Sequence, residues 1–463
     1  MVLLLALALV LRLLYVLELH QASRLAVLSL DEQFFDHWAQ RIAGGELLGQ
    51  GLFAANPLGA YMLGGLYALI GRDLVLIRPI QMVANTVTCL FVYQFTRNLL
   101  DRRAALTALG LAALFGPMIE VSAQLVAEVW ILFFAAGSLA LLTRREFVPW
   151  QRILAGALFA LAALGRSNLM MMAPLLPLAR GLIDPDLVRR QRMKRGLSWF
   201  AGMCLVLFPV MFRNLERGDS AAVFTGQGGT QMWIGNNPAA DGSFRIPPGS
   251  GLEGDQDSVG VSGVRVAGEG LERSVSPVEA GRYWRARLFS FMGEEPARFV
   301  GLLGRKLLLI TNAHDIRLEH GPDWFPSQLL RWLTVGFGLL NPLALTGVFL
   351  GRHQLRKLAP VFFFAGVFTC SVLPYFVTVR YRMPLILPLF TFGGLTLTVA
   401  WSFLRERLAS APGLRPVRVV RAALVFGGAL VLTYLPVQSG YPDEEGLEPE
   451  GHSPQRGPGL EPG

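Results

Sequence analysis

Apolar residues run along this chain in blocks of about 15–22, and short arginine-rich gaps separate the blocks. A helix of that length crosses a hydrocarbon core about 30 Å thick, because each residue adds about 1.5 Å. The pattern predicts an all-α polytopic membrane protein with about 11 transmembrane helices. The expected spans are residues 2–17, 74–96, 104–119, 127–142, 153–165, 168–180, 197–212, 329–350, 358–377, 383–404 and 422–437.

The arginine clusters at 97–103, 144–152 and 189–195 predict the orientation of these spans. Short cytoplasmic loops carry an excess of Lys and Arg, so these clusters are expected inside the cell. The chain then divides into a seven-span N-terminal catalytic module, an outer loop region, C-terminal transmembrane helices and a disordered tail. Their expected bounds are 1–213 (with its outer loop 18–73), 214–327, 328–437 and 438–463.

The outer segments carry local signals of their own. Block 57–70 is short for a span, and a full crossing would move two arginine clusters outside, so we place it on the outer face. Residues 226–270 are rich in glycine and are predicted to be loop. Ser276 and Glu279 have the spacing of a capping box, which predicts two amphipathic helices, at 277–292 and 296–311.

Composition agrees with a membrane protein. Hydrophobic residues make up 52% of the 463 residues and charged residues 16%, against about 25% charged in soluble chains. The net charge of +9 comes from arginines in short loops, so it reports orientation and not nucleic-acid binding. Cys89, Cys204 and Cys370 lie in apolar blocks and have the spacing of neither a disulfide framework nor a metal site. Arg12, inside the first span, is expected to face the bundle interior or to snorkel to an anionic partner.

The predicted topology gathers acids and arginines at the outer face. A carboxylate there can act as a general base on an acceptor hydroxyl. Arginines can hold a phosphate through paired hydrogen bonds, so the set suits sugar transfer from a lipid phosphate. The residues are Asp31, Glu32, Asp36, His37, Glu120, Glu128, Arg166, Arg213, Asn214, Arg380 and Arg382.

Several of these residues also have simpler interpretations. Asp31 and Glu32 are equally compatible with ordinary loop acids. Glu128 opens an apolar block, where the helix dipole favours an acid. Arg166 has the position of an anchor at the end of a span.

Five further positions complete this interpretation. Arg380 and Arg382 lie at the outer face against the positive-inside trend, which favours a specific role. Asp36 is expected to cap or pair. His37 and His314 could join the acids around a metal, although no metal-ligand spacing is present.

An ordered set of motifs covers about residues 1–405. These motifs are Leu30-Asp31-Glu32, Phe35-Asp36, Trp38-Ala39, Asn56-Pro57-Leu58, Gly71, Gly116-Pro117, Glu128, Leu164-Gly165-Arg166, Arg213-Asn214, Ile234-Gly235-Asn236-Asn237-Pro238, Ala240-Asp241-Gly242, Tyr283-Trp284, Arg305-Lys306 and Arg380-Tyr381-Arg382-Met383-Pro384. The set resembles the C-type, polyprenyl-phosphate-dependent glycosyltransferases. It is most similar to the bacterial branch related to protein mannosyltransferases and the lipid A aminoarabinose transferase, which is glycosyltransferase family 39-like.

This resemblance implies roles for the outer acids and arginines. Asp31 would be the catalytic base or would orient the acceptor, with Glu32 as its partner and Glu120 or Glu128 joining from the second outer loop. A Lys-Pro-Pro run of the aminoarabinose transferases is replaced here by Ala55-Asn56-Pro57, so arginines must contact the donor phosphate. The expected contacts are Arg166, Arg213 and Arg382, with Arg380, Asn214 and His37 as further site candidates. Metal dependence differs within this group, so a divalent metal stays open.

The function expected from these observations is transfer of a sugar from an undecaprenyl-phosphate donor to a periplasmic lipid, glycan or protein, at the bacterial inner membrane. A transporter or flippase of a lipid-linked saccharide is the main alternative. It would need polar residues at mid-bilayer depth, and apart from Arg12 these are scarce. A non-catalytic scaffold is a third reading, against which the intact outer acids argue.

Overall fold

The computed structural model describes residues 1–144, 148–183, 188–218, 226–253, 256–313, 327–408 and 416–436. Within these ranges every regular element is helical, and the single β-bridge joins Phe115 to Val335. The all-α prediction is confirmed. The long helices are α1 (Val2–Gln21), α4 (Leu74–Leu99), α5 (Arg102–Ala113), α7 (Glu128–Leu142), α8 (Pro149–Gly165), α10 (Arg189–Gly218), α16 (Phe337–Gly351), α17 (Leu355–Val372), α19 (Ile386–Leu408) and α20 (Pro416–Thr433).

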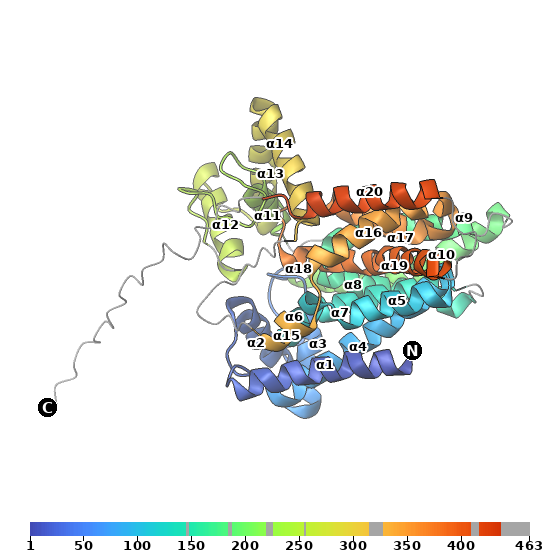
Figure 1. Cartoon of the computed structure of the whole chain (residues 1–463). Helices are drawn as coiled ribbons and strands as arrows, with labels where there is room; N and C mark the ends of the chain where they lie inside the picture. The colour runs from blue at the N-terminus through green and yellow to red at the C-terminus, as the bar shows by residue number, and fades with distance from the viewer. Residues whose placement is uncertain are drawn as a thin grey trace.

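The helices just named form a bundle, and α2 and α11–α14 lie at the end opposite the N-terminus (Figure 1). Helix α12 contacts α2 there. The remaining elements are α2 (Leu30–Ala43), α3 (Leu58–Ile70), α6 (Gly116–Ala123), η1 (Ser167–Met172), α9 (Leu175–Ile183), α11 (Gly228–Gly235), α12 (Gln256–Leu271), α13 (Pro277–Glu294), α14 (Pro296–Thr311), α15 (Gln328–Leu333), η2 (Arg352–Gln354), α18 (Val379–Arg382) and η3 (Met383–Leu385).

Among the described residues, five helical stretches are long and apolar enough to cross a membrane: 2–21, 74–99, 189–218, 337–372 and 379–406. Shorter apolar helices cover 58–70, 128–142, 167–179 and 420–433. The chain therefore has the helices of a multi-pass membrane protein. The count of 11 spans, the division into modules and the placement of 57–70 on the outer face stay predictions.

The third expected span, 104–119, is not one helix. Helix α5 ends at Ala113 and α6 begins at Gly116, with Pro117 in its first turn. A proline has no backbone N–H to donate and so starts a helix more readily than it continues one. The chain between the two helices instead pairs with Val335, which receives the Gly116 N–H and donates to Leu114.

Arg12 explains how this break is tolerated inside the bundle. Its side chain is fully buried and donates to the carbonyl oxygens of Ala112 and Ala113, at 3.2 and 3.1 Å. These carbonyls lie at the end of α5, where a helix leaves acceptors without partners. Asn85 accepts a further hydrogen bond from Arg12. The prediction that Arg12 faces the bundle interior is confirmed.

Residues 226–311 contain more helix than the sequence suggested. Helices α13 and α14 confirm the two expected at 277–292 and 296–311, and the Ser276–Glu279 capping box is formed. The prediction of loop across 226–270 is wrong, because α11 and α12 lie there. Glycines serve contacts between helices: a Cβ on Gly229 would meet the Gly281 carbonyl oxygen at 2.1 Å. Glycine content therefore reflected close packing in this region.

Candidate active site

The acidic pair opens helix α2, and the two acids have different surroundings. Ser29 is the N-cap residue, and its N–H and hydroxyl both donate to Glu32 Oε2, at 3.0 and 3.1 Å, with the spacing of a capping box. Glu32 also accepts the Leu125 N–H at 2.9 Å and lies 3.5 Å from the Arg78 guanidinium. Glu32 thus fixes the start of α2 against the turn between α6 and α7, and with it the position of Asp31.

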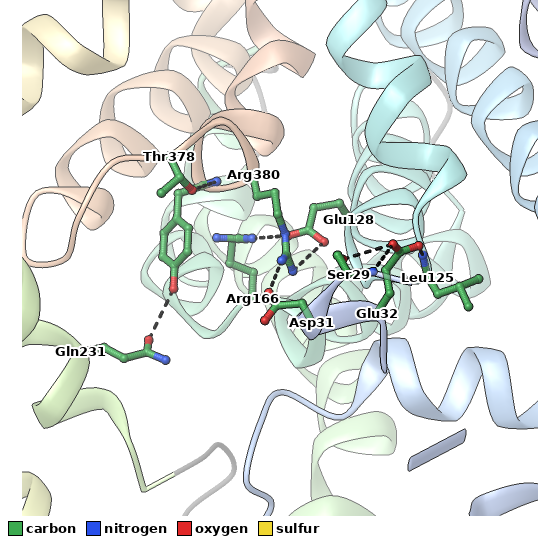
Figure 2. Close-up of polar contacts among 10 residues, drawn as sticks. Ser29, Asp31, Glu32, Leu125, Glu128, Arg166, Gln231, Thr378 and Arg380 are labelled. Carbon is green, nitrogen blue, oxygen red and sulfur yellow. Dashed lines mark hydrogen bonds and ion pairs between the residues drawn. The ribbon is translucent and has the colours of Figure 1, made fainter. Parts of the chain in front are cut away.

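Asp31 belongs to a network of four charged side chains from four separate segments (Figure 2). Arg380 of α18 donates from Nη1 to Asp31 Oδ2. The same guanidinium reaches both oxygens of Glu128, with Nε 3.0 Å from Oε1 and Nη2 3.3 Å from Oε2. Arg166 donates to Glu128 Oε1 at 2.7 Å. The structure therefore brings together four of the predicted site residues, which we call the acid–arginine network.

Exposure divides the acid–arginine network into an inner and an outer part. Glu128 is 1% exposed, and its charge is balanced by the two guanidinium groups, as a buried carboxylate requires. The side chains of Asp31 and Arg380 are 17% and 14% exposed. A substrate can therefore reach Asp31 and Arg380, while Glu128 holds the two arginines in place from behind.

Tyr381 adds an aromatic wall that the sequence analysis did not single out. The centre of its ring lies 4.3 Å from Arg166 Cζ, and its hydroxyl lies 3.4 Å from Gln231 Oε1 on α11. Arg78 was also missed, although it is a buried arginine within an apolar block, which is itself a signal. Thr378 caps α18 by accepting the Tyr381 N–H, which sets the direction of this short helix.

Arg213 and His37 lie at a second location. Both line a cavity of about 430 Å³ between α2, the segment after it and the end of α10. Arg213 donates to the carbonyl oxygens of Leu48 and Gly51 at 2.6 and 2.7 Å and to Asn214 Oδ1 at 2.8 Å. These contacts are with the cavity wall, so the structure separates Arg213 from the acid–arginine network.

Arg382 has a different environment from Arg380, two residues earlier. It is 1% exposed and donates to the carbonyl oxygens of Leu309 and Asn312, at 3.3 and 2.8 Å. Its guanidinium lies 3.9 Å from the centre of the Phe337 ring. These contacts hold the end of α14 and favour an anchoring role, while the predicted phosphate contact stays a prediction.

Asp36, Glu120 and Asn214 are the other predicted residues that the structure describes. Asp36 pairs, as expected: Arg72 donates to it at 2.9 Å and Tyr67 at 2.7 Å, which joins α2 to α3. Burial acts to raise the pKa of Asp36, but these hydrogen bonds outweigh it, and the pKa is lowered. Glu120 is half-buried on α6, and Asn214 is fully buried; their roles stay predictions.

A metal site does not emerge from the part of the chain that the structure describes. Within it, no three His, Cys, Asp or Glu side chains lie together as a metal would require. His314, which the sequence analysis considered together with His37, lies outside the described residues.

A buried lysine ties the outer helices to the segment that carries Arg380. Lys306 of α14 is fully buried and donates to Asn236 Oδ1 at 2.6 Å and to the Leu373 carbonyl at 2.8 Å. Asn236 in turn donates to the Pro374 carbonyl at 2.7 Å. Burial lowers the pKa of Lys306 to about 7. The sequence analysis includes Lys306 in the Arg305-Lys306 motif but assigns it no role.

Comparison with known proteins gives one match in sequence and several in structure. Residues 54–212 match the family model for dolichyl-phosphate-mannose-protein mannosyltransferase. No curated protein matches the chain.

Two solved proteins represent the structural matches. The Archaeoglobus fulgidus oligosaccharyltransferase, solved with a tethered acceptor peptide, is 14% identical with a TM-score of 0.42; the match covers 84% of this chain and 48% of that protein. ArnT from Cupriavidus metallidurans, solved with undecaprenyl phosphate, is 15% identical with a TM-score of 0.40, over 90% of this chain and 81% of ArnT. The chain spans about half the length of the archaeal enzyme. Both TM-scores are below 0.5, so assignment to a family depends on the sequence match.

Proposed function

We propose that the protein transfers a sugar from a polyprenyl-phosphate donor to an acceptor hydroxyl, because residues 54–212 match the family model for dolichyl-phosphate-mannose-protein mannosyltransferase. The donor class follows the lipid phosphate for which the family is named. We further propose that the donor is an undecaprenyl-phosphate sugar and that the site faces the periplasm at the bacterial inner membrane.

The observation that supports this reaction is the partly exposed Asp31–Arg380 pair in front of buried Glu128. In the proposed step, Asp31 accepts the proton of the acceptor hydroxyl as its oxygen attacks the anomeric carbon of the donor. The bond from that carbon to the phosphate oxygen breaks, and polyprenyl phosphate leaves with the bonding electron pair. Asp31 is assigned this role because its carboxylate has the greater exposure, whereas both oxygens of Glu128 are held by arginines.

Arginine provides the countercharge for the leaving phosphate. Negative charge grows on the phosphate as the sugar leaves, and fixed cationic donors in a site partly shielded from water stabilise that charge. Arg380 is the arginine beside Asp31, and Arg166 supports it through Glu128. We therefore propose Arg380 as a further phosphate contact. Arg166 is proposed to support Arg380 by binding Glu128.

The test is a transfer assay with purified protein, reconstituted in liposomes, and a panel of undecaprenyl-phosphate sugars. Lipid A, an oligosaccharide and a serine-containing peptide serve as acceptors, so that each acceptor class is represented. Product formation by the wild type with one donor supports the proposal. Movement of a labelled donor across the bilayer without any product would instead indicate the flippase alternative.

A further inference from the structure

The cavity at Arg213 lies outside the acid–arginine network and has walls of a distinct kind. Its volume of about 430 Å³ lies within the range of about 300–1,000 Å³ usual for small-molecule sites. Aromatic rings form much of the wall, and among the residues that the structure describes no acidic side chain lines it. A cavity of this kind can bind and orient a substrate, and it lies apart from the Asp31–Arg380 pair proposed for the chemistry.

Trp38 is the centre of the aromatic wall. Its ring centroid lies 5.8 Å from that of Phe34, 5.6 Å from Phe53 and 6.4 Å from Tyr61, in tilted or edge contacts. Phe53 is buried, and the Arg213 guanidinium lies 3.9 Å from its centre, which fixes the ring from behind. Trp38 itself is only half-buried. The cavity thus contains a large, held aromatic surface, the kind of surface on which the C–H face of a sugar ring packs.

Polar side chains stand beside this aromatic surface. Gln33 and His37 are exposed, line the cavity and lie four residues apart, so they share one face of α2. Gln33 uses its Nε2 to donate to the Leu28 carbonyl, which leaves its amide oxygen to accept from a ligand. An imidazole both donates and accepts. An aromatic surface flanked by such groups matches a sugar ring, which has apolar faces and hydroxyls around its edge.

The distance between Asp31 and Trp38 along α2 indicates which ring of the substrate would stack on Trp38. Trp38 follows Asp31 by seven residues, about two turns or about 10 Å along the helix, and on the same face. The sugar whose bond is broken must lie against Asp31. A ring stacked on Trp38 is therefore a neighbouring unit of an extended substrate.

We propose that this cavity binds a saccharide ring of the acceptor, stacked on Trp38 and hydrogen-bonded by Gln33 and His37. The proposal rests on the proposed transfer reaction and narrows its acceptor to a glycan or a glycolipid. A peptide without sugar would leave the cavity unfilled.

Binding is tested first, because it does not require turnover. Purified wild-type protein is exposed to hydroxyl radicals with mannotriose, cellotriose, lipid A or a serine-containing peptide, and oxidation of each tryptophan is read by mass spectrometry. We expect one of the saccharide probes to reduce oxidation of Trp38 but not of Trp150, which is exposed on α8 and does not line the cavity. Equal oxidation of Trp38 with every probe would overturn the proposal.

Kinetics then separate acceptor from donor. Trp38→Ala should raise the KM for the acceptor about tenfold, Trp38→Phe should restore most of the loss, and Trp150→Ala should change nothing. Gln33→Ala, at an exposed position, gives the same direction of change without disturbing the aromatic wall. A rise in the KM for the donor alone would mean that the cavity holds the donor sugar and would refute the acceptor assignment.

The two proposals fail in different ways. If the wild type transfers sugar and the Trp38→Ala and Gln33→Ala variants keep both KM values, the cavity proposal is wrong and the transfer proposal stands. If saccharides protect Trp38 but the wild type transfers no sugar from any donor, the transfer proposal is wrong and the cavity remains a saccharide site.

Discussion

Two groups of arginines in this protein have their hydrogen bonds satisfied in different ways. Around the α5 break, Arg12 is enclosed by backbone carbonyls and an amide, and Arg382 likewise binds carbonyl oxygens at the end of α14. In the acid–arginine network, Arg380 and Arg166 bind carboxylates, and Arg380 keeps part of its surface open. The first kind of arginine completes hydrogen bonds that broken helices leave unmade. The second kind is positioned where a further anion can be bound.

The strongest test of this difference is a change at Asp31, the partly exposed carboxylate that Arg380 binds. Asp31→Asn keeps the size of the side chain and removes the carboxylate charge, so transfer should fall by roughly 10²–10⁴, the usual contribution of a positioned general base. Initial rates with the donor identified by the panel measure the loss, and size-exclusion chromatography confirms folding. Glu46→Gln, an exposed acid in the same outer loop, is the matched control. Near wild-type rates for Asp31→Asn would transfer the role to Glu32 or Glu128.

Changing Arg380 and Arg382 in turn to lysine tests the difference between the two groups of arginines directly. Arg380→Lys should lower kcat by roughly 100-fold, because a lysine cannot reproduce the paired hydrogen bonds to Glu128 and offers the leaving phosphate one donor less; such a donor is worth about 3 kcal/mol. The measurement is kcat per folded molecule. A variant with full kcat and unchanged donor affinity would rule out the proposed phosphate contact.

Arg382→Lys should affect stability and leave the reaction nearly unchanged. The guanidinium spans two carbonyl groups and packs on Phe337, and losing part of this arrangement should cost about 1–3 kcal/mol of unfolding free energy. Thermal unfolding in detergent gives the stability, and kcat per folded molecule should match wild type. A loss of kcat at full stability would restore the original prediction that Arg382 binds the donor phosphate.

The smallest expected effect is a pH dependence from Lys306. Its pKa is lowered from 10.5 to about 7 in the folded protein. Between pH 7 and pH 10.5 the unfolded chain holds a proton on Lys306 that the folded protein has lost. The free energy of unfolding should therefore rise as the pH increases through this window. Unfolding midpoints at pH 7 and pH 10 should differ by a few degrees more for the wild type than for Lys306→Met. Identical pH dependence in the two proteins would contradict the burial argument.

Sequence patterns predicted the membrane-type helical fold because apolar block length and arginine placement are local properties. They also selected Asp31, Glu128, Arg166 and Arg380, since a charge beside an apolar block is conspicuous. What they could not supply was pairing between distant segments. Arg380 and Arg382 look alike in one motif, and only the fold shows that one meets carboxylates and the other carbonyls.

Helices α11 and α12 show a different limit of prediction from sequence. Residues 226–270 contain many glycines, which in isolation predict loop. In the folded chain, a Cβ at Gly263 would press on Thr230, and the Gly263 carbonyl accepts the Trp284 indole N–H at 2.9 Å. A glycine that permits close helix contact has the same sequence signature as one that permits a turn, so the distinction requires the partner helix.

Glu32 has a consequence for how the enzyme is made. Residues 30–43 leave the ribosome well before Leu125, so during synthesis Glu32 can close its capping box but must wait for the turn that anchors it. Arg380, the partner of Asp31, is synthesised later still. A nascent or truncated chain therefore presents the acidic pair without fixing its direction. The carboxylate of Asp31 is therefore aimed only when the distant segments that hold it are in place.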